Sequence, residues 1–387
     1  MKLASRMSRL GTETAFEALA RAKSLEAQGR SIIFLGIGEP DFDTPDHIVG
    51  AAKQALEDGY THYTPSAGIA EVREAIAADM GGRLGHEVSG ANVIVTPGGK
   101  PVMFFTILAL AEEGDEVIYP NPGFPIYESM IRFAGATPVP MQLHEERGYN
   151  PDVDELRALV SPRTKLIIVN SPNNPCGSVI PEQDLVAIAE IANEADAVVL
   201  SDEIYKDFYY EGSHVSITRY PGMWERTVVL DGLSKSYAMT GWRVGYGLFP
   251  DELVEPVTRL MTNSVSCTSA FSQVTAMAAL ASSQESVTSM VAEFKTRRDL
   301  LVNGLNELPG ISCPMPKGAF YAFPNISRTG RTSQEFEESL LKDAGVSVLA
   351  GTSFGAFGEG YVRISFANSQ ENIREALRRM GGWLVDC

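Results

Sequence analysis

Two hydrophobic patterns alternate along the chain. Residues 13–28 place apolar side chains on one side of a predicted helix that ends at Gly29, and an extended segment follows over residues 31–36. Further along, short apolar runs rich in β-branched residues alternate with helical patterns. These runs predict strands at residues 92–96, 116–119, 165–170, 197–201, 227–230 and 244–248. Strands separated by crossover helices predict an α/β fold with a mainly parallel sheet.

Several of the predicted strands end in glycine or polar residues. The endings are TPGGK at residues 96–100, NSPNN at 170–174, SDE at 201–203 and DGLSK at 231–235. Ligands collect at the carboxyl ends of strands in open α/β sheets, so these endings predict one shared crevice. After about residue 287 the pattern changes to a long charged helix, strand-like pieces at 319–323 and 361–365, and a closing helix over 371–384. This part predicts a smaller α+β domain.

Composition and charge narrow the class of protein. The 387 residues are 44% hydrophobic and 21% charged, which is typical of a folded globular protein, and the length suggests two domains. Lys and Arg number 32 against 49 Asp and Glu, and the resulting net charge of −17 argues against nucleic acid and anionic membranes as partners. The longest largely apolar run, residues 102–111, is too short to span a bilayer. We therefore expect a cytoplasmic protein.

Cysteine and histidine spacing gives two further expectations. The four cysteines are far apart and form no CxxC pair, so reduced thiols are expected at Cys176, Cys267, Cys313 and Cys387. The five histidines show no spacing typical of metal ligands. We expect no catalytic metal.

Lys235 is the strongest candidate for catalysis. A lysine at a strand end among small residues can be shielded from solvent. This desolvation lowers the pKa of the ammonium group, and the neutral amine can then form a Schiff base. Arg243 follows eight residues later and offers a planar fork for a phosphate. Gly99 and Lys100 lie between a strand and a predicted helix, where backbone amides can bind a phosphate, although this turn could also be a plain connection. The Walker pattern fails because Pro101 stands where Ser or Thr is needed.

Each of the other candidate residues could have either a functional or a purely structural role. Asp202 could cap a helix or pair with the nitrogen of a pyridinium cofactor. Tyr205 and Asn174 could bind a phenolate oxygen on such a ring, or could be a core tyrosine and a turn residue. Phe124, in a proline-rich loop, could stack on a flat cofactor or pack in the core. Arg363 interrupts an apolar strand, and a buried arginine requires a carboxylate partner from the substrate or from the protein.

Together these motifs resemble the class I, fold-type I aminotransferases that use pyridoxal 5′-phosphate, in the branch of bacterial aspartate and aromatic aminotransferases. The segments that carry the resemblance are LGIGEPDF at residues 35–42, YTPSAG at 63–68, NSPNNPCG at 170–177, SKSYAMTGWRVG at 234–245 and YVRIS at 361–365. The resemblance implies a three-layer fold. It further implies an N-terminal arm with part of the small domain at residues 1–44, a large cofactor-binding domain at 45–286 and a small C-terminal domain at 287–387.

The same resemblance implies a role for each candidate. Lys235 would form the Schiff base and move the substrate α-proton, Asp202 would pair with the pyridine nitrogen, and Asn174 and Tyr205 would bind the ring oxygen O3′, with Phe124 stacked on the ring. The phosphate would be held by Gly99, Lys100, Ser234, Arg243 and, from the neighbouring subunit of a homodimer, Tyr63. The substrate would be bound by Gly38, Asn174 and Arg363.

Two positions depart from the family pattern. Cys176 replaces the threonine that usually precedes Gly177. Gly232 stands where some branches of the family have a phosphate-binding serine, so the resemblance leaves Ser234 as the serine expected to bind the phosphate. The implied activity is the exchange of an amino group between an L-amino acid and an oxo acid such as 2-oxoglutarate, with ping-pong kinetics. Because Lys100 matches a lysine thought to recognise a distal carboxylate, aspartate or glutamate is the leading substrate. Alternatives are an aromatic or alanine-type aminotransferase, a β-lyase on the same scaffold, and a regulatory protein that retains the cofactor.

Overall fold

A computed structural model describes residues 1–386 of the chain, and Cys387, one of the expected reduced thiols, lies outside the described residues. The main sheet has eight strands in the order β2-β9-β8-β7-β6-β3-β4-β5. Its strands are β2 (Val93–Thr96), β3 (Glu116–Asn121), β4 (Thr137–His144), β5 (Asn150–Pro151), β6 (Thr164–Asn170), β7 (Val198–Asp202), β8 (Thr227–Gly232) and β9 (Gly245–Leu248). Strands β4, β3, β6, β7 and β8 run parallel, whereas β5 and β9 pair antiparallel with their neighbours. The expected mainly parallel α/β sheet is confirmed.

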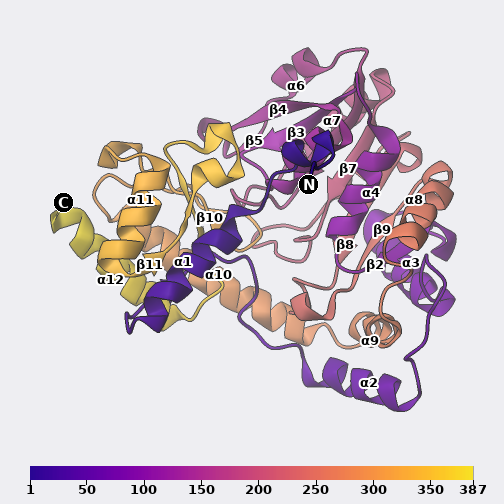
Figure 1. Cartoon of the computed structure of the whole chain (residues 1–387), viewed down its shortest axis with the longest axis horizontal. Coiled ribbons are helices and arrows are strands. Elements are labelled where there is room, and N and C mark those ends of the chain that lie inside the picture. The colour runs from indigo at the N-terminus through magenta and orange to yellow at the C-terminus, as the bar shows by residue number, and fades with distance from the viewer. Residues whose placement is uncertain (387) are drawn as a thin grey trace.

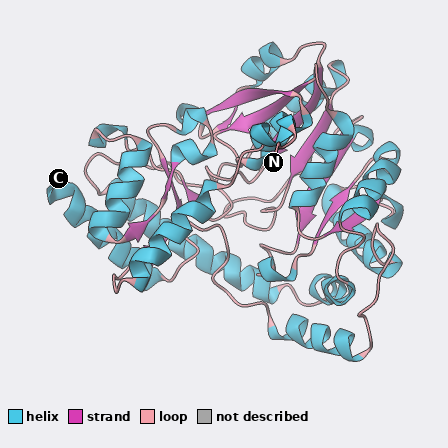
Figure 2. Ribbon diagram, in the orientation of Figure 1, coloured by secondary structure: helices cyan, strands magenta, loops and turns pink. Residues whose placement is uncertain are grey.

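Helices cover both faces of this sheet (Figures 1 and 2). They are α3 (Ala70–Leu84), α4 (Lys100–Leu110), α5 (Ile126–Ala134), α6 (Val153–Leu159), α7 (Glu182–Glu194), α8 (Asp251–Ser264) and α9 (Ala270–Ala281). Helix α2 (Asp46–Glu57) packs against α9 instead, at the edge of the molecule (Figure 1). Alternate residues of one strand enter opposite cores: Leu166 and Ile168 of β6 join the cluster with α4, α5 and α8, while Ile167 joins the cluster with α6 and α7. Because successive side chains of a strand point to opposite faces, the sheet is packed against helices on both faces, which gives a three-layer structure.

The elements after residue 284 form a second group, whose core also includes Leu35, Tyr205 and Phe208 from earlier in the chain. The long helix α10 (Glu285–Asn306) and the last helix α12 (Gln370–Asp386) pack around short strands. The other elements of this group are β10 (Tyr321–Ala322), α11 (Ser333–Ser339), β11 (Val346–Ser347), β12 (Leu349–Ala350) and β13 (Val362–Ser365). From the N-terminal end, α1 (Thr14–Ala27) lies near this group, and β1 (Ile33–Phe34) pairs in parallel with β11 (Figure 1).

Some elements differ from the sequence prediction. The extended segment at 31–36 forms only the two-residue strand β1, and β4 and β5 were not predicted. Strand β4 contains two prolines and alternates weakly, and this pattern hides it because proline is disfavoured within strands. No helix in residues 1–386 combines the length and apolarity needed to cross a membrane. The division at residues 44 and 286 stays a prediction.

Candidate active site

A cavity of about 460 Å³ opens at the carboxyl ends of β6, β7 and β8. It is bordered by the start of α4, by the segment that follows β1, and by Arg363 of β13. All of the site residues predicted from the sequence line this cavity except Tyr63. The side chain of Tyr63 is 89% exposed and lines a different hollow on the surface. The crevice expected from the strand endings therefore exists within one chain.

Lys235 follows β8 by three residues and projects its amine into the cavity. Nζ donates a hydrogen bond to the carbonyl oxygen of Gly38 at 2.5 Å and lies 5.9 Å and 5.8 Å from the ring centroids of Tyr205 and Phe320. Burial removes water from the ammonium group and lowers its pKa to about 8. The amine is thus close to its proton-exchange range at neutral pH, which suits a base or a nucleophile.

Asp202 is the last residue of β7 and its carboxylate is buried. The hydroxyl of Tyr127 on α5 donates to Oδ2 at 2.5 Å, and the backbone amide of Ile204 donates to Oδ1 at 3.2 Å. Burial raises the pKa of the carboxyl to about 6, and these two hydrogen bonds act in the opposite direction. Asp202 is therefore a buried acceptor that would gain from a cationic partner in the cavity.

Arg363 is a buried cation without an ion-pair partner among residues 1–386. Nη1 donates to Oδ1 of Asn174 at 2.9 Å, Nη2 donates to the carbonyl oxygen of Gly36 at 2.5 Å, and Nε has no hydrogen-bond partner. The guanidinium lies 4.5 Å from the ring centroid of Tyr321 and 4.6 Å from that of Phe354. Because an unpaired buried cation is costly, this arrangement favours an anion from outside the chain.

Arg243 and the turn before α4 form a second place for an anion. Arg243 adopts a left-handed backbone conformation, with φ of 55°, and its Nη2 donates to the carbonyl oxygen of Pro97 at 3.2 Å. A Cβ atom on Gly98 would lie 2.2 Å from that Nη2 and would displace the guanidinium, and the φ of 84° at this position also favours glycine. Gly99 caps α4, whose amino end carries partial positive charge. Ser234 is buried beside this turn and lines the same cavity.

The tyrosines and Phe124 shape the remaining walls. The hydroxyls of Tyr205 and Tyr321 are 2.6 Å apart, and a Cβ atom on Gly38 would lie 2.2 Å from the Tyr321 hydroxyl. The Phe124 ring meets the edge of the Tyr127 ring, with centroids 5.7 Å apart. The position of Gly38 therefore requires the absence of a side chain.

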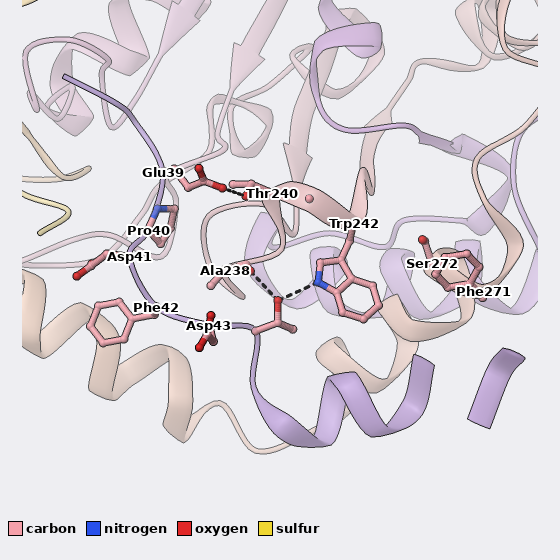
Figure 3. A pocket seen from close by; sticks show the side chains of 12 residues that line it. Glu39, Pro40, Asp41, Phe42, Asp43, Ala238, Thr240, Trp242, Phe271 and Ser272 are labelled. Atoms are coloured by element: carbon pink, nitrogen blue, oxygen red, sulfur yellow. Dashed lines mark hydrogen bonds between the residues drawn. The ribbon is translucent and has the colours of Figure 1, made fainter. Parts of the chain in front are cut away.

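A second hollow, of about 510 Å³, lies beside the cavity and shares Glu39, Thr240 and Gly241 with it (Figure 3). Its wall ties the segment after β1 to the turn that carries Arg243. The hydroxyl of Thr44 accepts a hydrogen bond from Nε1 of Trp242 at 2.9 Å and donates to the carbonyl oxygen of Ala238 at 2.7 Å. These bonds fix the loop between Lys235 and Arg243.

Sequence reasoning missed several cavity residues, among them Glu13, Tyr127 and Tyr321. Tyr127 lies on α5, and no sequence pattern indicated that its hydroxyl would face Asp202. Glu13 stands at the start of α1 and gave no signal beyond that of a helix terminus.

The two departures from the family pattern have local structural settings. A Cβ atom on Gly232 would lie 2.9 Å from Cα of Gly245, its partner across β8 and β9, so close strand pairing accounts for glycine there. Cys176 is a buried free thiol whose pKa is raised by burial, and Cys267 and Cys313 are also free. Within residues 1–386, no group of three or more His, Cys, Asp or Glu side chains is placed to hold a metal ion.

Comparisons with known proteins agree with this geometry. The sequence model of the family described as aminotransferase class I and II matches residues 30–380. The chain is 42% identical to an aspartate aminotransferase of Pyrococcus horikoshii, over 94% of this chain and 92% of that protein. It is 43% identical to aromatic-amino-acid aminotransferase 2 of Thermococcus litoralis, over 92% of each. The structure of Thermus thermophilus aspartate aminotransferase with maleate superposes with a TM-score of 0.94 at 39% identity over 99% of both chains. The chain therefore belongs to the class I and II aminotransferases.

Proposed function

We propose that this aminotransferase takes an L-amino acid with a distal carboxylate, of the aspartate or glutamate type, and passes its amino group to an oxo acid such as 2-oxoglutarate. Membership of the family makes the protein a transaminase that depends on pyridoxal 5′-phosphate, as the sequence predicted. The observation that carries the substrate proposal is Lys100, a cation that lines the same cavity as Lys235 and Arg363. Of the four basic side chains that line the cavity, Arg363 and Lys100 are the two that we assign to the two carboxylates of such a substrate.

The residues present suit pyridoxal 5′-phosphate. The turn at Gly98 and Gly99 with Arg243 offers donors for a phosphate, and the buried Asp202 offers an acceptor for a protonated ring nitrogen. Tyr205 and Asn174 line the same cavity as Lys235, and we assign them to the ring oxygen. When bound, the cofactor supplies an electron sink for the bond broken at the substrate α-carbon.

The chain's own groups would then do the following. Arg363 binds the substrate α-carboxylate through its unpartnered Nε, and Asn174 holds the guanidinium in place. Nζ of Lys235 takes the proton from the substrate α-carbon and returns it later, which its lowered pKa favours. Asp202 keeps the proton on the ring nitrogen, because a buried carboxylate is stabilised by a cation beside it.

An amino-donor panel with 2-oxoglutarate tests the substrate proposal. Single-turnover spectra with aspartate, phenylalanine and alanine should show aspartate as the fastest donor. The proposal fails if aspartate is the slowest of the three. Release of pyruvate from a cysteine conjugate without any oxo acid would instead indicate a β-lyase.

An aromatic donor is the second candidate. The cavity wall contains Phe16, Met103 and Phe124, which could pack against an aromatic side chain, and one relative is named an aromatic-amino-acid aminotransferase. A higher kcat/KM for phenylalanine than for aspartate would favour this candidate.

We also propose a homodimer in which Tyr63 reaches the phosphate site of the partner. The exposed Tyr63 ring lines a hollow of about 520 Å³ with Leu56 and Tyr60, and all three side chains are exposed apolar or aromatic groups that a partner could cover. Light scattering measures the oligomeric state. Mixing inactive Lys235→Ala and Tyr63→Ala chains should restore activity only if sites are shared between subunits. The cytoplasmic location stays a prediction, which cell fractionation tests.

A further inference from the structure

Glu13 and Lys100 form an ion pair at the edge of the cavity. Glu13 directly precedes α1 and Lys100 begins α4, and Nζ and Oε2 are 2.5 Å apart. The Lys100 side chain is 49% exposed and that of Glu13 22% exposed, and both residues line the cavity. The Lys100 ammonium also lies 5.4 Å from the ring centroid of Phe124. The N-terminal segment thus supplies a carboxylate to the cation assigned above to the substrate side chain.

The other charges of the cavity have different partners. Arg363 has no carboxylate partner among the side chains that the structure describes, and Asp202 accepts its hydrogen bonds from Tyr127 and a backbone amide. Glu39 accepts a hydrogen bond from Thr240. Lys100 is therefore the one cavity cation whose charge is balanced by a carboxylate of the described chain.

Glu13 also acts electrostatically on the reacting groups. Its negative charge raises the pKa of Lys235 and of Arg363, in both cases against the larger lowering effect of burial. Lys100 has the opposite effect on Lys235. Glu13 is therefore close enough to act electrostatically on a charged group bound between these side chains.

We propose that Glu13 is a specificity-determining residue whose carboxylate competes with the distal carboxylate of an acidic substrate for Lys100. The inference rests on the proposed function, because it takes Lys100 as the receptor for the side chain. An acidic substrate must displace Glu13 or share Lys100 with it. A neutral side chain instead meets an ion pair that is already balanced. The Glu13 carboxylate thus weakens the binding of acidic substrates relative to neutral ones.

Glu13→Gln keeps the shape of the side chain and removes its charge. We expect it to tighten the binding of succinate, the aspartate analogue without an amino group, by about fivefold, which is the scale of one partly exposed ion pair. Binding of 3-phenylpropanoate, the matching analogue of phenylalanine, should weaken by about twofold, because Lys100 would lose its counter-charge beside an apolar ligand. The ratio of the two dissociation constants should thus shift about tenfold, and the ratio of kcat/KM for aspartate and phenylalanine should follow.

The holoenzyme is titrated with each analogue while the visible absorption of its cofactor is recorded. Glu17→Gln is the matched control, because Glu17 is an exposed acid in the first turn of α1, close to Glu13 in sequence, and does not line the cavity. It should leave both dissociation constants within about twofold of the parent. An equal effect of Glu13→Gln and Glu17→Gln would overturn the inference, because it would reflect net charge alone. Glu13→Ala, measured alongside, should shift the ratio in the same direction.

Lys100→Gln separates this inference from the proposed function. If Lys100→Gln does not weaken succinate, Lys100 is not the receptor and the substrate proposal fails with the inference. If it weakens succinate while Glu13→Gln leaves the ratio of dissociation constants unchanged, only the inference about Glu13 fails. In the Lys100→Gln background the effect of Glu13→Gln should disappear, and its persistence would contradict competition for Lys100.

Discussion

Replacing Asp202 with asparagine should stabilise the cofactor-free protein at neutral pH while disabling its chemistry. Burial raises the pKa of the Asp202 carboxyl from 3.8 to about 6. The pKa of this carboxyl is higher in the folded than in the unfolded chain, so the folded chain binds more protons between pH 3.8 and about 6. The stability of the fold therefore falls as the pH rises through this interval. The shift corresponds to about 3 kcal/mol of destabilisation at pH 7.5 and about 1.5 kcal/mol at pH 5.0.

Asparagine removes the ionisation and keeps an oxygen that can accept the Tyr127 hydroxyl. Cofactor-free Asp202→Asn should therefore be more stable than the parent, and this gain in the free energy of unfolding should be about 1.5 kcal/mol larger at pH 7.5 than at pH 5.0. Urea denaturation at the two pH values measures this difference. An identical difference between the two proteins at both pH values would refute the reasoning, because Asp202 would then titrate as it does in the unfolded chain.

The same variant should lose activity when the cofactor is present. A neutral asparagine cannot stabilise a proton on the ring nitrogen, so kcat should fall by about 10²- to 10⁴-fold. Steady-state kinetics at saturating cofactor measures this change. A variant that is both stabilised without cofactor and fully active would show that the buried charge serves no step of the reaction.

Three further variants test the other parts of the site. Lys235→Ala should abolish turnover and the visible absorption band of the bound cofactor, since the amine that reacts is gone, and retention of both would reject Lys235 as the reacting lysine. Arg363→Lys should raise KM for the amino donor by about 10- to 100-fold, because an ammonium cannot replace the fork that contacts Asn174 and Gly36, and an unchanged KM would place the substrate carboxylate elsewhere. Gly98→Ala should weaken cofactor affinity by about tenfold or more, as measured by titrating cofactor-free protein, because the new Cβ displaces the guanidinium beside it. Gly114→Ala is its control, since Gly114 also has a positive φ but has no neighbour within 4 Å of the added atom.

Much of the cavity could be predicted from local sequence. Asp202 ends a strand, and Gly99 and Lys235 each follow a strand by three residues. Because the carboxyl ends of parallel strands meet at one edge of a sheet, their convergence follows from the strand order. The structure brings these residues together in one cavity. Their chemical roles, and that of Tyr63 in a partner subunit, stay predictions.

Other features depend on contacts between distant segments. The Tyr127 hydroxyl lies 75 residues from Asp202 in sequence, and Glu13 lies 87 residues from Lys100. Neither pair leaves a local pattern in the sequence. A residue at a helix terminus, or an aromatic residue within a helix, has the same sequence context whichever partner it contacts in the fold. The prolines of β4 likewise hid a strand whose place is set by its pairing with β3.

Periodicity and near neighbours were enough to predict the alternating strands and helices, the polar strand endings and the lysine and arginine motifs. The folded chain was needed to show that Arg363 is buried with no counter-ion among the described side chains, that Tyr127 donates a hydrogen bond to Asp202, and that Glu13 pairs with Lys100. Burial and long-range pairing set the charge state of a group, and both arise only when segments far apart in the chain meet. The net charge of −17 describes the whole molecule, whereas these contacts determine the charges inside the cavity.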